Sequence, residues 1–147
     1  MLIETELENA LAAAFAPLLP DDAALVRSRA AETEADASSC VVAVATGFRS
    51  HEAFSLPMIS IAVNLTVATR IDRDPDGDTH EKVVEALSAK LERWHFKPNE
   101  FAAALALSRF EPGELRLTGG SGRVLSRESA VWTETLSFQI VGSEVFT

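Results

Sequence analysis

The stretch from Met58 to Ile71 limits the fold more than any other part of the sequence. Apolar side chains occupy every second position on one face, apart from position 69: Ile59, Ile61, Val63, Leu65, Val67 and Ile71. The other face carries Ser60, Ala62, Asn64, Thr66, Ala68 and Arg70. A period of two predicts a long β-strand with one buried face. At about 3.3 Å per residue it would span roughly 45 Å, so we expect it to extend beyond its own domain.

Two segments have helical spacing instead. In residues 2–16 the apolar side chains recur every four residues, at Ile3, Leu7, Leu11 and Phe15. Residues 79–95 carry an apolar stripe of Val83, Val84, Leu87, Leu91 and Trp94. Asp78 and Glu81 give this second helix a start close to a capping box. A third, short helix is expected over residues 99–107, directly after Pro98.

Further strands are expected near residues 25–29, over 41–49, around Leu115 and Leu117, and over 131–141. In the last of these, Trp132, Leu136, Phe138 and Ile140 share the apolar face. The Gly-rich run 119–123 is predicted to be a flexible connection. This order predicts a single α+β domain over residues 1–147, with a mainly antiparallel sheet of four to five strands. We expect the helices on one face and a long hairpin whose second strand is 58–71.

Composition narrows the classes of protein further. A chain of 147 residues with 47% hydrophobic residues can bury one core. The formal net charge of −9 disfavours general nucleic-acid binding, because acidic proteins repel the phosphate backbone. The single cysteine, Cys40, can form no internal disulfide and is interpreted as a small buried hydrophobe. No run of about 20 apolar residues is present, so we expect no membrane association.

The aspartate-rich run between the long strand and its helix has two interpretations. Its carboxylates alternate as in the opening of a calcium loop: Asp72, Asp74, Asp76 and Asp78. The twelfth position of such a loop should be a bidentate Glu, and here it is Val83. The run is therefore either a solvated turn that starts a helix, or the site of a calcium-dependent binding module. No other cofactor is expected.

Enzyme motifs begin in this sequence but are not completed. His51-Glu52 and His80-Glu81 each open the pattern of a zinc protease, yet the fifth positions are Ser55 and Val84. Ser121 lies between two glycines at a spacing that does not fit a hydrolase elbow. The sequence therefore predicts a protein that is not an enzyme. If it were an uncharacterised small enzyme, the first residues to mutate would be His51, Glu52, His80 and Glu81.

The order of elements resembles one known family. An amphipathic helix precedes a strand pair whose second strand is long, and a polar turn leads into a helix that begins Asp78-Thr79-His80-Glu81-Lys82-Val83-Val84. A closing strand, Val131 to Val141, ends the chain. This arrangement looks like that of the tail-terminator and tail-completion proteins of tailed bacteriophages. The likeness covers most of the chain, except for the short helix at 99–107 and the Gly-rich run.

The resemblance implies a structural role in particle assembly. Members of this family form a ring, commonly a hexamer, at the head-proximal end of the tail tube. The implied partners are further copies of the chain, the tail tube protein and the head–tail connector. The implied location is the cytoplasm during assembly and then the virion. From loop position we place the contacts between subunits at Arg49, His51, Phe54, Arg123 and Arg127.

Overall fold

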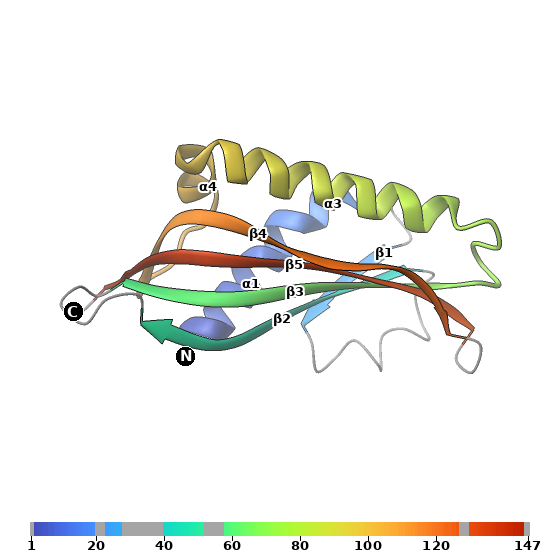
Figure 1. The fold of residues 1–147 in the computed structure, drawn as a ribbon, viewed down its shortest axis with the longest axis horizontal. Coiled ribbons are helices and arrows are strands. Elements are labelled where there is room, and N and C mark those ends of the chain that lie inside the picture. The colour runs from blue at the N-terminus through green and yellow to red at the C-terminus, as the bar shows by residue number, and fades with distance from the viewer. Residues whose placement is uncertain (1, 20–22, 28–39, 52–57, 127–129, 146–147) are drawn as a thin grey trace.

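The computed structural model describes residues 2–19, 23–27, 40–51, 58–126 and 130–145. Its elements along the chain are α1 (Ile3–Phe15), the 3-10 turn η1 (Ala16–Leu18), β1 (Ala23–Arg27), β2 (Cys40–His51), β3 (Met58–Arg70), α3 (Asp78–Phe96), α4 (Pro98–Ala104), β4 (Phe110–Ser126) and β5 (Val131–Glu144). Figure 1 shows the strands as one long, twisted sheet with α3 lying along it.

The five strands within the described residues have the order β1-β2-β3-β5-β4. β1 pairs with β2 in parallel, and every other neighbouring pair is antiparallel. The α+β class, the mainly antiparallel sheet and the long β2–β3 hairpin are confirmed. α4 ends at Ala104, earlier than expected, because Leu105 is extended and turns its side chain into the core.

β3 has one buried face, as its alternating pattern predicts, but it does not extend beyond the domain. It lies between β2 and β5, and β5 pairs with it along its whole length, from Met58 opposite Ser143 to Arg70 opposite Val131. The expectation of an overhanging strand is therefore wrong. The alternation reports which face of a strand is buried, whereas the length of its neighbours depends on residues far away in the chain.

The helices cover one face of the sheet. The core joins the buried stripe of α1 and that of α3 to the alternate side chains of β2, β3 and β5 that face them. Trp94 of α3 packs between Phe15 and Phe101, with ring centroids 5.5 and 5.2 Å apart. These three aromatic side chains tie α1, α3 and α4 into a single layer.

The other face of the three central strands, which we call the open face, is uncharged in its middle part, where its side chains are half-buried or exposed. Its side chains on β2, β3 and β5 are small or neutral and polar: Ala43, Ala45, Ala62, Asn64, Thr66, Ala68, Thr133, Thr135, Ser137 and Gln139. Ser137 Oγ donates a hydrogen bond to Asn64 Oδ1 across this face at 2.6 Å. None of these side chains is long enough to form a second core layer.

The Gly-rich run 119–123 is not a connection. It lies inside β4, the longest strand at 17 residues, where the pairing with β5 shifts between Leu117 and Gly119 and again between Ser121 and Val124. Gly119 has a φ of 125°, which favours glycine. A Cβ atom at Gly120 would lie 2.2 Å from the Thr135 carbonyl oxygen. Glycine here permits close approach within an irregular strand, so the prediction of a loop is wrong.

Candidate functional site

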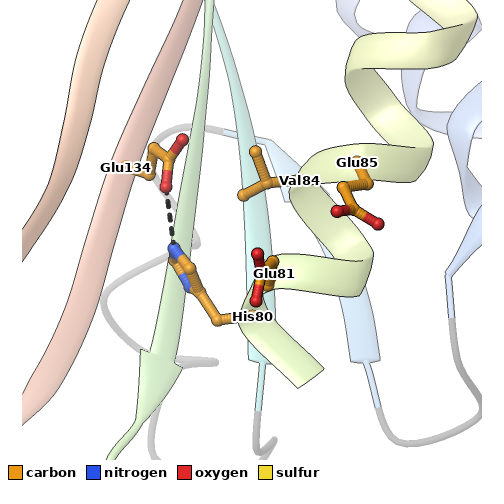
Figure 2. Close-up of a pocket in the computed structure, with 5 residues that line it drawn as sticks. All are labelled: His80, Glu81, Val84, Glu85 and Glu134. Carbon is orange, nitrogen blue, oxygen red and sulfur yellow. Dashed lines mark hydrogen bonds and ion pairs between the residues drawn. The ribbon is translucent and has the colours of Figure 1, made fainter. Parts of the chain in front are cut away.

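Polar side chains interrupt the apolar face of the sheet beneath the first turn of α3. Thr69 of β3 and Glu134 of β5 lie on this face, and the His80 side chain of α3 contacts both. Figure 2 shows the contact between His80 and Glu134. His80 Nδ1 lies 2.8 Å from Thr69 Oγ1, and His80 Nε2 lies 3.3 Å from Glu134 Oε1. Thr69 Oγ1 is also 3.3 Å from the sulfur of Cys40 on β2. We refer to Cys40, Thr69, His80 and Glu134 as the His80 cluster.

The turn before α3 fixes the position of His80. The Asp74 carboxylate accepts hydrogen bonds from the backbone N–H groups of Thr79, at 3.1 Å, and His80, at 2.8 Å. Gly77, with a φ of 77°, makes the sharp entry into the helix. The indole N–H of Trp132 donates to the Asp74 carbonyl at 3.2 Å. Asp74 therefore anchors the start of α3 to the end of the β4–β5 hairpin.

Burial and chemistry define what the His80 imidazole can do. Its side chain is 1% exposed, whereas that of Glu134 is 19% exposed. A carboxylate accepts hydrogen bonds but does not donate them when ionised, so Nε2 must carry the hydrogen shared with Glu134. Thr69 can donate or accept at Nδ1. The cluster therefore links a buried titratable group to a carboxylate that solvent reaches.

A cavity of about 360 Å³ lies beside the cluster. It is lined by His80, Glu81, Val84, Glu85 and Glu134, and Figure 2 shows the three carboxylates around it. The lining offers proton carriers and negative charge. None of the described residues in this lining has a hydroxyl or thiol, and Thr69 and Cys40 are fully buried. The described residues that line this cavity therefore supply carboxylates and an imidazole, but no hydroxyl or thiol nucleophile.

The residues selected for an enzyme are not brought together. His51 lies at the end of β2 opposite Ile59, whereas His80 contacts Thr69, ten positions further along β3. That spacing corresponds to about 33 Å along the strand. Glu81 lines the cavity beside His80, and Glu52 lies outside the described residues.

The four aspartates of the turn have separate roles. Asp72 pairs with Arg70 at 2.9 Å, and Asp74 binds the start of α3. Asp76 and Asp78 are exposed. Across the described residues, which include the whole turn, no group of three or more His, Cys, Asp or Glu side chains could hold a metal ion. Of the four, Asp74 is the one that is buried, and it accepts the hydrogen bonds at the start of α3.

Arg49, proposed as a subunit contact, is engaged within its own chain. A bulge between Thr46 and Arg49 turns its side chain to the helix-covered face. Arg49 Nε lies 2.8 Å from Glu4 of α1, and Nη1 lies 3.0 Å from Glu144 of β5. The hydrogen bonds from Arg49 lower the pKa of the Glu4 carboxyl and raise that of the guanidinium.

Two of the other proposed contacts, His51 and Arg123, belong to strands at opposite ends of the sheet. His51 is exposed at the end of β2, and Arg123 belongs to the far half of β4. Phe54 and Arg127 lie outside the described residues, as does the arrangement of the Arg123 side chain.

Sequence reasoning missed Thr69 and Glu134, although a signal was present. Both occupy positions where the alternation predicts an apolar side chain, Thr69 between Val67 and Ile71 and Glu134 between Trp132 and Leu136. A polar residue at a buried position needs a partner. Two such residues on different strands indicate a shared polar cluster.

Comparison with known proteins adds no family to this description. No family model matches the chain, and no curated protein matches it. Among the described residues, no helix is long and apolar enough to cross a membrane.

Proposed function

We propose that this protein is a structural assembly protein that forms a ring, resembling the terminator at the head-proximal end of a phage tail tube. The observation that carries the proposal is the group of exposed apolar side chains on β4 from Leu117 to Leu125. This strand forms an edge of the sheet, and its residues Leu117, Val124 and Leu125 are 43, 54 and 40% exposed. An exposed apolar edge strand is a ready surface for another protein chain.

The two ends of the sheet support a ring rather than a closed pair. A ring uses heterologous contacts, in which two different patches of neighbouring subunits meet. His51 and Val124 lie at opposite ends of the sheet. His51 pairs with Ile59, near the start of β3. Val124 pairs with Thr133 of β5, and Thr133 pairs with Ala68, near the end of β3. Patches this far apart can each meet a different neighbour.

Charge is compatible with a passage for DNA. A net charge of −9 opposes binding of the phosphate backbone, and the open face of the central strands is neutral in its middle part. DNA could therefore move past such a ring without adhering to it.

Self-association tests the proposal directly. The purified protein, from micromolar to near-millimolar concentration, should give rings in negative-stain electron microscopy and a mass of several subunits by light scattering. Replacing Val124 and Leu125 by lysine should abolish the rings, because charged side chains on an edge strand oppose pairing.

The matched control is Leu2→Lys, which places the same charge at another exposed apolar residue, one that is 65% exposed at the start of α1. This variant should assemble like the wild type. A wild-type protein that stays monomeric at every concentration, alone and with added tail tube protein, would rule the function out.

A further inference from the structure

We propose that His80 is a pH-sensitive latch. In mildly acidic solution the protein holds this imidazole protonated, as an ion pair with Glu134, and the contact between α3 and the sheet becomes tighter. This inference concerns a buried titratable side chain that bridges one helix and two strands. It does not depend on the proposed function.

The hydrogen bonds described above between His80, Thr69, Cys40 and Glu134 can form in both protonation states. When Nδ1 is bare, the Thr69 hydroxyl donates to it, and the Cys40 thiol can donate to Thr69. When Nδ1 is protonated, it donates to Thr69 Oγ1, and the Thr69 hydroxyl turns to the Cys40 sulfur. Nε2 donates to Glu134 in both states. A proton added at Nδ1 therefore reverses two hydrogen bonds and leaves none of these polar atoms unpaired.

The charged groups around the imidazole favour this proton. From the sheet, Glu134 of β5 contacts the imidazole, and β2 contributes the uncharged thiol of Cys40 through Thr69. The Asp74 carboxylate holds the backbone of His80 itself, and Glu81 and Glu85 of α3 line the same cavity. Among the described residues lining that cavity there is no lysine or arginine. Burial opposes a charged imidazole, but an opposite charge within hydrogen-bond distance offsets that cost.

His80 lies where the first turn of α3, the turn before it and the end of the β4–β5 hairpin are in contact. Asp74 links the backbone of His80 to the indole of Trp132, and Trp132 lies on β5 beside the end of the hairpin. A tighter contact between His80 and the sheet therefore stabilises three neighbouring parts together: the first turn of α3, the turn before it and the end of the hairpin.

The sign of the pH effect depends on whether the folded or the unfolded state binds the proton of the His80 imidazole more tightly. The unfolded chain has a free imidazole, which titrates near pH 6.5. Because Glu134 lies beside the imidazole, the folded state binds the extra proton more tightly, and the stabilisation by His80 is fully present in acid. It is lost as the pH rises through the range in which the folded imidazole titrates.

Urea unfolding of the wild type and of His80→Gln, in buffer with EDTA, tests the latch between pH 5.5 and 8. The ratio of their folding equilibrium constants cancels the titrating groups that do not interact with residue 80. We expect the ratio of the wild-type constant to that of His80→Gln to be about tenfold larger at pH 5.5 than at pH 8. A tenfold change corresponds to one pH unit in the linkage relation. In a Glu134→Gln background the growth should disappear. A ratio that stays constant, or that falls towards acid, would overturn the proposal.

Two further measurements keep the test decisive. His51→Gln removes an exposed histidine and should leave the ratio to wild type nearly independent of pH. If His80→Gln does not fold, nitrogen NMR of the histidine rings in the wild type and in Glu134→Gln replaces it. The wild type should show both ring nitrogens of His80 protonated at pH 5.5. A neutral His80 ring at that pH would refute the latch.

Discussion

The two faces of the β-sheet differ in the burial, the size and the polarity of their side chains. One face is covered by α1, α3 and α4, and its side chains are large and apolar, with Leu65 and Phe138 almost fully buried. The other face, the open face, carries small and neutral side chains in its middle part, and these are half-buried or exposed. Folding stability comes from the covered face, and the open face is available for contacts outside the subunit.

Polar groups follow the same division. On the covered face they lie where helices meet strands: Arg49 with Glu4 at one end and His80 with Glu134 at the other. Each joins residues that are far apart in the sequence. On the open face, the hydrogen bond between Ser137 and Asn64 is exposed to solvent. Polar contacts under the helices therefore specify how the layers dock, whereas those on the open face contribute little to folding.

The largest effect is expected from a truncation on the covered face. Leu65→Ala removes a side chain with no exposed surface from the centre of β3 and should destabilise the fold by about 2–5 kcal/mol. Asn64→Ala, the adjacent residue on the open face, should change stability by no more than about 0.5 kcal/mol. Urea unfolding at pH 7 measures both variants. Equal losses would contradict the assignment of the two faces.

The next effect concerns the edge strand. Gly120→Ala places a Cβ 2.2 Å from the Thr135 carbonyl oxygen, so the backbones of β4 and β5 must move apart. Overpacking of this kind typically costs about 1–3 kcal/mol. Gly122→Ala is the control, because a Cβ there meets nothing within 4 Å. Thermal melts of the two variants should differ by several degrees. Similar melting temperatures would show that β4 does not pack against β5 at this point.

The Gly-rich run is an example of what could not be predicted from the sequence. The period of β3 and the stripes of α1 and α3 predicted the elements and their buried faces, because burial on one side leaves a repeating pattern. The placement of the Gly-rich run inside β4 was not predictable, since glycine favours loops and bulges alike. The partners of Arg49 and His80 were also hidden. Glu4, Glu144 and Glu134 lie far away in the chain, and only the tertiary fold brings them close.

A smaller effect, with a defined pH dependence, is expected at the Arg49 ion pair. Folding lowers the pKa of Glu4, so its contribution is present above the pKa of the unfolded carboxyl, about 4.3, and is lost as the pH falls through the folded value. Because both side chains are partly exposed, we expect Glu4→Gln to cost about 1 kcal/mol at pH 7. The cost should vanish near pH 2. Urea unfolding at the two pH values measures it.

The matched control for Glu4 is Glu100→Gln, which breaks an ion pair of the same length, 2.8 Å, with Arg93 on the solvent side of the helices. It should leave stability unchanged at both pH values, since solvent screens fully exposed charges. If Glu100→Gln were as destabilising as Glu4→Gln, the position of Arg49 between helix and sheet would have no special importance.

The smallest effect on folding is expected from Ser137→Ala, which removes the hydroxyl that donates to Asn64 on the open face. Water can replace this hydrogen bond, so the unfolding free energy of the monomer should change by less than about 0.5 kcal/mol. The measurement is sharpest when repeated across protein concentrations. A loss that appears only at high concentration would show that the open face is covered by another subunit in the assembled state. A loss at every concentration would mean that this face stabilises the single chain, and the division between the two faces would fail.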